Sequence, residues 1–111
     1  PPHGLYLFVS SSIPEATLVA LATDAAPLRT PVILRGMVGD SLQNMIATMA
    51  PLLKVGAGVE IDPLLFEAYG IDKVPAVVLT CGARGEGPYA VVYGIGPSAA
   101  LPILQKLLSC S

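Results

Sequence analysis

The chain has few charged residues. Only 13% of its 111 residues are Asp, Glu, Lys or Arg, about half of the ~25% usual for soluble domains. The six basic residues are scattered and form no stripe, so a surface that follows a nucleic-acid backbone is not expected. Apolar residues make up 53%. Exposed apolar patches are typical of partner-binding surfaces, although an Ala- and Leu-rich ordinary domain has the same composition.

The sequence also lacks an unbroken apolar run. The longest uncharged stretch, 87–105, is interrupted by three prolines, so we expect no membrane-spanning helix. The length fits one domain over residues 1–111. The chain opens with Pro1-Pro2-His3 and shows neither an initiator Met nor a leader. We therefore expect a trimmed or mature fragment.

Residues for nucleophilic, metal or redox chemistry are scarce. The one histidine, His3, lies at the N-terminus, so a Ser–His catalytic pair is not expected. The two cysteines, Cys81 and Cys110, are far apart, which excludes a CxxC centre and a zinc site built from them alone. Acidic residues at 60, 62 and 67 do not have the spacing of an oxygen-ligand loop, and Asp62 is most simply a helix cap. We expect no metal and no cofactor.

What is present is a regular alternation of strand and helix patterns. Strands are expected at 5–9, 31–35, 59–62, 76–80 and 89–93, and helices after residues 13, 40, 62 and 97. The order places parallel βαβ units before a hairpin and a closing helix. It predicts an α/β fold with a mixed sheet and helices on both faces.

Local signals give the expected ends of the first and last helices. A serine of the Ser10–Ser12 run can cap the first helix before Pro14, and Pro27 is expected to end it. Ser98 can cap the last helix. Pro102 is then expected in its first turn, where proline is tolerated.

The second helix carries a clear apolar stripe. Asp40 or Ser41 can cap it, and Pro51 is expected to kink or stop it near Ala50. The stripe recurs at helical spacing, so it is expected to pack on the protein. Its members are Leu42, Met45, Ile46 and Met49.

Two segments resemble the thioredoxin fold. One is a buried strand that leads into Ser12-Ile13-Pro14-Glu15, and the other, 69–78, is similar to the family's segment with its cis-proline. The resemblance implies a thioredoxin-like mixed sheet flanked by helices, a helical insertion around Met45, and a cis bond between Val74 and Pro75. The alternative is a trans proline that opens an edge strand.

The redox centre of that fold is missing here. Thioredoxin chemistry needs a cysteine at the helix N-terminus, where the helix dipole lowers the thiol pKa, and a second cysteine one turn later. Ser12 and Glu15 stand at these positions. A serine hydroxyl cannot undergo thiol–disulfide exchange, so we interpret Ser12, Ile13, Pro14 and Glu15 as a degenerate redox site without catalytic function.

Three blocks carry a more specific resemblance. The blocks FVSSSIPEATL, PVILRGMVGDSL and IDPLLFEAYGIDKVPAVVL are similar to the type-F conjugative transfer pilin assembly protein TrbC family. The resemblance implies a periplasmic part of a type IV secretion system that builds conjugative pili. It also implies a non-catalytic assembly role through protein–protein contacts, with a TraW-like protein as partner.

A partner surface is expected beside Val74-Pro75. Without redox cysteines, the groove there can still hold an extended segment by backbone hydrogen bonds. Arg35, at the end of a strand, can pair with a carboxylate or meet a partner, and the sequence leaves both open. The candidate partner-binding residues are Ser11, Ser12, Arg35, Val74 and Pro75.

The two cysteines are expected to meet. The strand that ends near Cys81 and the helix that ends near Cys110 both run to the end of the sheet opposite Ser12. A disulfide there closes a loop of about 30 residues, which raises the free energy of unfolding by roughly 3–4 kcal/mol. A disulfide also fits an oxidising compartment. Two unpaired thiols are the alternative. The alternative functions are a thiol–disulfide isomerase or chaperone-like protein that uses these cysteines, and a holdase that uses the groove at Pro75.

Overall fold

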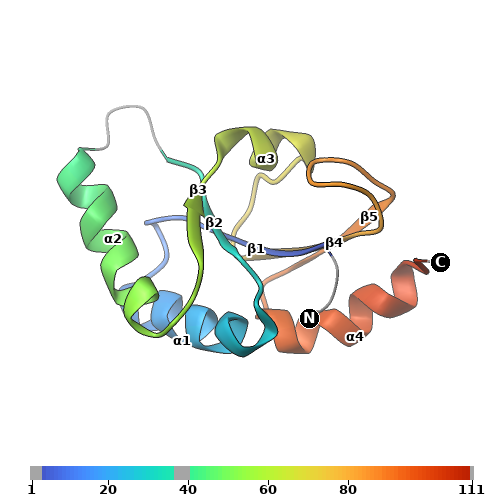
Figure 1. Cartoon of the computed structure of the whole chain (residues 1–111), viewed down its shortest axis with the longest axis horizontal. Coiled ribbons are helices and arrows are strands. Elements are labelled where there is room, and N and C mark those ends of the chain that lie inside the picture. Colours follow the sequence, from blue (N-terminus) through green and yellow to red (C-terminus); the bar gives the residue numbers. More distant parts are fainter. Residues whose placement is uncertain (1–3, 37–40, 111) are drawn as a thin grey trace.

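The computed structural model describes residues 4–36 and 41–110 (Figure 1). A five-stranded sheet has the order β3-β2-β1-β4-β5, and the predicted α/β class with a mixed sheet is confirmed. In these residues the elements are β1 Leu5–Val9, α1 Glu15–Ala25, η1 Ala26–Leu28, β2 Val32–Leu34, α2 Leu42–Lys54, β3 Val59–Ile61, α3 Pro63–Ala68, β4 Ala76–Thr80, β5 Tyr89–Tyr93 and α4 Pro97–Leu107.

The central strand β1 is buried on both faces. It pairs parallel with β2 and antiparallel with β4, which in turn forms the predicted hairpin with β5. Because successive side chains point to opposite faces, Leu5, Leu7 and Val9 enter one core cluster and Tyr6 and Phe8 enter the other. Burial on both faces explains why this strand is continuously apolar.

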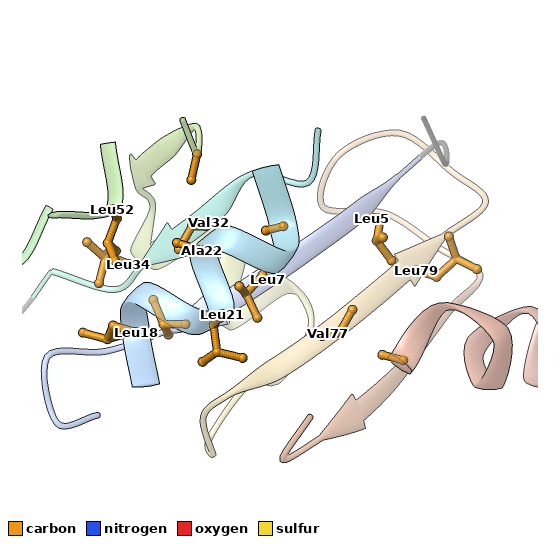
Figure 2. Close-up of a cluster of buried hydrophobic side chains, with 14 of the residues drawn as sticks. Leu5, Leu7, Leu18, Leu21, Ala22, Val32, Leu34, Leu52, Val77 and Leu79 are labelled. Carbon is orange, nitrogen blue, oxygen red and sulfur yellow. The ribbon is translucent and has the colours of Figure 1, made fainter. Parts of the chain in front are cut away.

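The larger core lies between the sheet and helices α1 and α4. Leu18, Leu21 and Ala22 of α1 pack on Leu7 and the neighbouring strands (Figure 2). Helical spacing in the sequence places Leu18, Leu21, Ala22 and Ala25 on one face of this helix, and all four are buried. Helices α1 and α4 cover this face, and α3 covers the opposite face (Figure 1).

The smaller core under α3 is aromatic. The ring of Phe8 meets the ring of Phe66 edge-on, with 4.9 Å between centroids. Tyr69 lies beside both Tyr6 and Phe8. Gly70 follows α3 with φ of 62°, a conformation that glycine adopts without a steric penalty.

The start of α1 differs from expectation, whereas its end agrees. Pro14 is the N-cap residue and no side chain caps the helix, so the predicted serine cap is wrong. The Ser12 hydroxyl bonds to the Ser10 hydroxyl instead. The α-helix ends at Ala25, just before Pro27 as predicted, and Pro27 lies in the short 3₁₀ helix η1 that follows. Proline fits there because the first-turn N–H groups of a helix have no intrahelical partner.

Helix α2 also departs from its prediction. Ser41 caps it by accepting a bond from the Asn44 amide, while Asp40 lies outside the described residues. The helix continues through Pro51 to Lys54. Proline removes the bond to the carbonyl of Ala47, and that carbonyl lies on an exposed part of the helix, where water can replace the lost donor.

The predicted apolar stripe of α2 packs only in part. Met49 packs against the larger core and Met45 is half-buried, whereas Leu42 is 73% exposed and Ile46 is 56% exposed. The helix lies beside the sheet, against α1 and β3 (Figure 1). Helical periodicity identifies an apolar face but does not say what covers it.

Helix α4 is capped from another helix. Its N-cap residue is Gly96, and the carboxylate of Asp24 in α1 accepts bonds from the backbone N–H and the hydroxyl of Ser98. The predicted cap by Ser98 is therefore wrong. Because the helix begins at Pro97, Pro102 lies in the second turn and not in the first. Among the described residues, no helix has the length and apolar character needed to cross a bilayer.

Candidate functional site

The pairing of the strands brings three loops to one end of the sheet. Val9 pairs with Leu34, so Ser10 and Arg35 follow neighbouring parallel strands at the same end. Phe8 pairs with Ala76, the first residue of antiparallel β4. The residues before β4 therefore return to the same place. We call this end of the sheet the mouth.

A hollow at the mouth contains three of the predicted partner-binding residues. Ser12, Arg35 and Val74 line it together, and Pro75 lies behind Val74 without lining it. Its remaining lining residues, which the sequence did not single out, are Ser10, Phe66, Ile71 and Asp72.

Two further hollows extend from the mouth towards α2. One shares Ser10 and Arg35 with the first hollow and reaches Met45 and Thr48. The next lies between Ser11 of the loop and α2, and Ile13 and Glu15 also line it. The predicted residue Ser11 therefore belongs to the α2 side of the mouth. The sequence analysis did not predict that α2 lines these hollows, and the apolar stripe of α2 was the one sequence feature that pointed to this helix.

Arg35 anchors one wall of the mouth. Its guanidinium donates a hydrogen bond of 2.7 Å to the carbonyl oxygen of Ile71 and lies 4.8 Å from the ring centroid of Phe66. Within residues 4–36 and 41–110, no carboxylate lies within ion-pair distance of Arg35. The side chain is exposed at the surface, so the cation remains available beside the hollow.

The four residues predicted to be a degenerate redox site lie in the loop before α1 and at its start. Ser12 and Glu15 are exposed, Ile13 is half-buried against the larger core, and Pro14 begins the helix. No histidine occurs in the described part of the chain, and a serine nucleophile needs a general base. His3 lies outside the described residues.

Val74 presents backbone groups at the mouth. The Val74–Pro75 peptide bond is cis, and Pro75 accepts a hydrogen bond of 2.9 Å from the amide of Gly94. In the described part of the molecule, neither the N–H nor the C=O of Val74 has a backbone or side-chain partner. These two groups can pair with an extended segment of another chain.

The two cysteines lie at the opposite end of the sheet. Cys81 follows the last residue of β4, and a disulfide joins it to Cys110, with 5.2 Å between the Cα atoms. The predicted disulfide is confirmed, and no free cysteine remains. Cys81 follows Pro75 by a whole strand, so the two ends are roughly 20 Å apart at ~3.3 Å per residue.

A hydrogen-bond network fixes the hairpin loop near the disulfide. The hydroxyl of Tyr69 donates to the carbonyl of Glu86 and accepts from the amide of Gly85. Thr80, fully buried at the end of β4, also donates to the carbonyl of Glu86. We call the disulfide and this network the locked end.

An ion pair beside the network uses the acidic residues excluded as a metal site. Arg84 contacts Asp62 at 2.9 Å and Glu60 at 3.3 Å. Asp62 also caps α3 by accepting a bond from the amide of Leu65, as expected. The hydrogen bond from Arg84 lowers the pKa of Asp62 below its ordinary value, and the bond from Leu65 adds to this. No group of metal-ligating side chains occurs among the residues that the structure describes.

Comparisons with known proteins agree with the resemblance of the sequence blocks. The sequence model of a family described as type-F conjugative transfer system pilin assembly protein matches residues 7–94. "Periplasmic protein TrbC" of Escherichia coli (strain K12) is 43% identical over 83 residues. The match covers 73% of this chain but only 39% of that protein. The name of this relative supports the predicted periplasmic location.

Proposed function

Because the chain belongs to the type-F conjugative transfer system pilin assembly protein family, we propose that it acts in that system as a non-catalytic scaffold. In this proposal the protein holds other transfer proteins through contacts at the mouth. It does not exchange electrons or cleave bonds. The location is the periplasm, as for the relative.

One observation carries the proposal. Both cysteine sulfur atoms are joined to each other at the locked end, whereas the mouth contains Ser12 and Glu15. Thiol exchange needs a thiolate that is accessible to its substrate, usually activated at a helix N-terminus. A thiol enzyme that used Cys81 or Cys110 would have to work from the end of the sheet opposite the N-terminus of α1.

The chemistry of the mouth fits an extended polypeptide. The free N–H and C=O of Val74 match the backbone of a strand-like segment. The exposed Ser11 and Ser12 add hydroxyl groups, and Arg35 adds a cation. We infer that the partner is another transfer-system protein, with a TraW-like protein as the first candidate from the family resemblance.

The test blocks the mouth without touching the core. Ser12 is exposed and lines the hollow, so Ser12→Tyr places a bulky ring over the groove. The matched control is Ser109→Tyr, at an exposed site near the disulfide. Tagged protein is used to capture partners from periplasm that contains the transfer proteins, and a purified TraW-like protein is titrated in parallel.

The proposal expects wild type and Ser109→Tyr to retain the same transfer protein. Ser12→Tyr is expected to lose roughly tenfold in affinity or more, because a blocked pocket loses its buried contacts. Capture of no transfer protein by the wild type would contradict the scaffold role. Equal binding by Ser12→Tyr would contradict the assignment of the mouth.

A further inference from the structure

The two open edges of the sheet differ in how they are protected. The β3 edge has only three residues, with Glu60 at its centre in an ion pair with Arg84. Short length and charge are the usual means of preventing strand pairing at an edge. The β5 edge has five residues, Tyr-Ala-Val-Val-Tyr, and none is charged. It therefore lacks the protection that the other edge has.

The hydrogen-bond register shows which backbone groups face outward from β5. Pro88 accepts a bond from the amide of Cys81, and Gly94 donates to the carbonyl of Pro75. Inward and outward residues alternate along an antiparallel strand, so residues 88, 90, 92 and 94 direct their backbone groups to β4. Tyr89, Val91 and Tyr93 direct their N–H and C=O groups to the open edge.

These outward residues are symmetric about Val91. A second β5 strand placed antiparallel around a twofold axis at Val91 pairs Val91 with Val91 of the second copy. The same axis pairs Tyr89 with Tyr93 in both directions. Each is a pair of outward-facing residues, so each can exchange two N–H···O=C bonds, and no like charges meet. The tyrosines are 42% and 43% exposed, and cross-strand aromatic pairs stabilise sheets.

Helix α4 supplies an independent apolar surface for the same arrangement. It packs on Val77 and Leu79 of β4 and on Ala90 and Val92 of β5. On this twofold axis the two α4 helices therefore lie about two strand spacings apart, or ~10 Å. This is the usual distance between packed helices.

The exposed side chains of α4 lie on the side that this packing needs. Ser98 bonds to Asp24 and so marks the flank that faces α1. At 100° per residue, Ile103 and Leu107 fall on the opposite flank, towards the β5 edge. They are 44% and 63% exposed, and nothing in the described part of the chain covers them fully.

We propose that the β5 edge and the outer flank of α4 form a homodimer interface with a second copy of this chain. The two sheets then join through β5 into one continuous sheet, and the α4 helices pack across the twofold axis. A short strand and one helix flank make a small interface, so the association is weak and depends on protein concentration. No residue of β5 or α4 lines the three hollows described at the mouth, so the inference is independent of the proposed function.

The direct test is amide hydrogen exchange of the 111-residue chain, from roughly 10 µM to 1 mM, the range of weak association. Sedimentation equilibrium is measured on the same samples. We expect the amides of Tyr89, Val91 and Tyr93 to become protected as the dimer forms. The amides of Ala90 and Val92 pair with β4, so they are expected to be protected at every concentration.

A charge swap tests the symmetry. The variant with Tyr89→Lys and Tyr93→Lys places lysine opposite lysine, and we expect dimerisation to weaken roughly tenfold or more. The variant with Tyr89→Glu and Tyr93→Glu is expected to behave alike, and an equal mixture of the two variants is expected to dimerise. The variant with Leu42→Lys and Ile46→Lys adds the same charge at two exposed sites on α2 and serves as the matched control. Circular dichroism establishes that each variant is folded.

Three outcomes would overturn the proposal. One is a monomer at the highest concentration with rapid exchange at Tyr89, Val91 and Tyr93. Another is a dimer in which these amides stay unprotected, since it would use a different surface. A third is folded lysine and glutamate variants that fail to associate when mixed.

Discussion

The two ends of β4 have opposite characters. At the mouth, the backbone N–H and C=O of Val74 have no partner among residues 4–36 and 41–110, and they lie beside the exposed Ser12 and Arg35. At the locked end, Thr80 is fully buried, and the residue after it is fixed by a disulfide. One strand of five residues separates a surface with open binding groups from a region in which polar groups are paired.

This difference supports our proposal that stability and partner recognition depend on separate ends of the sheet. Cross-links and paired buried groups stabilise a fold, whereas exposed, unpaired backbone groups contribute little to stability and remain free to bind. Changes at the locked end should therefore destabilise the protein without altering the proposed partner surface at the mouth. Changes at the mouth should weaken partner binding without unfolding the protein.

The largest expected effect comes from removal of the disulfide. We expect Cys81→Ser combined with Cys110→Ser to lower the free energy of unfolding by about 3–4 kcal/mol, because the loop of 29 residues is no longer closed in the unfolded chain. Urea denaturation measures the loss. Partner capture is measured at a temperature where the variant is folded, and we expect it to be unchanged. Loss of partner capture by the folded variant would show that the two cysteines are needed for partner binding.

The next effect concerns the hairpin network. Tyr69→Phe removes the acceptor for the amide of Gly85 and one donor to the carbonyl of Glu86. We therefore expect the free energy of unfolding to fall by about 1–2 kcal/mol. Thermal unfolding measures this loss. Tyr93→Phe serves as the control, because Tyr93 is exposed, and its effect should stay within about 0.5 kcal/mol. Equal effects of the two changes would contradict the role of the network.

The smallest expected effect is at Asp62 and depends on pH. Asp62→Ala removes the cap of α3 and the contact to Arg84. We therefore expect the free energy of unfolding to fall by about 1 kcal/mol at pH 7. The folded state lowers the pKa of Asp62. Its contribution is therefore present above the ordinary carboxyl pKa near 4 and is lost as the pH falls through the lower folded-state value.

Denaturation of wild type and Asp62→Ala at several pH values measures the contribution of Asp62 to stability as a function of pH. The difference in unfolding free energy should shrink below about pH 4. Glu67→Ala is the control, because Glu67 is an exposed acid on the same helix. A difference for Asp62→Ala that is independent of pH would exclude the proposed charge contribution.

Much of the fold follows from local patterns in the sequence. The bounds of β1 and β4 agree with those of the apolar runs, because strands buried on both faces read as continuous apolar segments. The bounds of β5 also agree with the prediction, although this edge strand is only partly buried. The meeting of Cys81 and Cys110 followed from the direction of one strand and one helix. The cap of α3 by Asp62 is a local contact, and its prediction is confirmed.

The failures concern contacts between distant elements. Asp24 caps α4 from α1, and Arg35 reaches the carbonyl of Ile71, so the sequence near either residue contains no signal for its partner. The stripe on α2 was expected to pack but is partly exposed, because periodicity does not define what lies opposite a helix. For the same reason the sequence indicated the loops of the mouth but missed the wall that α2 forms.

Insulin reduction by dithiothreitol tests most directly whether the chain lacks thiol catalysis. The wild type is compared with the Cys81→Ser and Cys110→Ser variants and with dithiothreitol alone. We predict the same rate of insulin precipitation in all of these samples, because the mouth contains no cysteine and the disulfide lies at the other end of the sheet. A faster rate with the wild type, lost when either cysteine is replaced, would contradict the scaffold role.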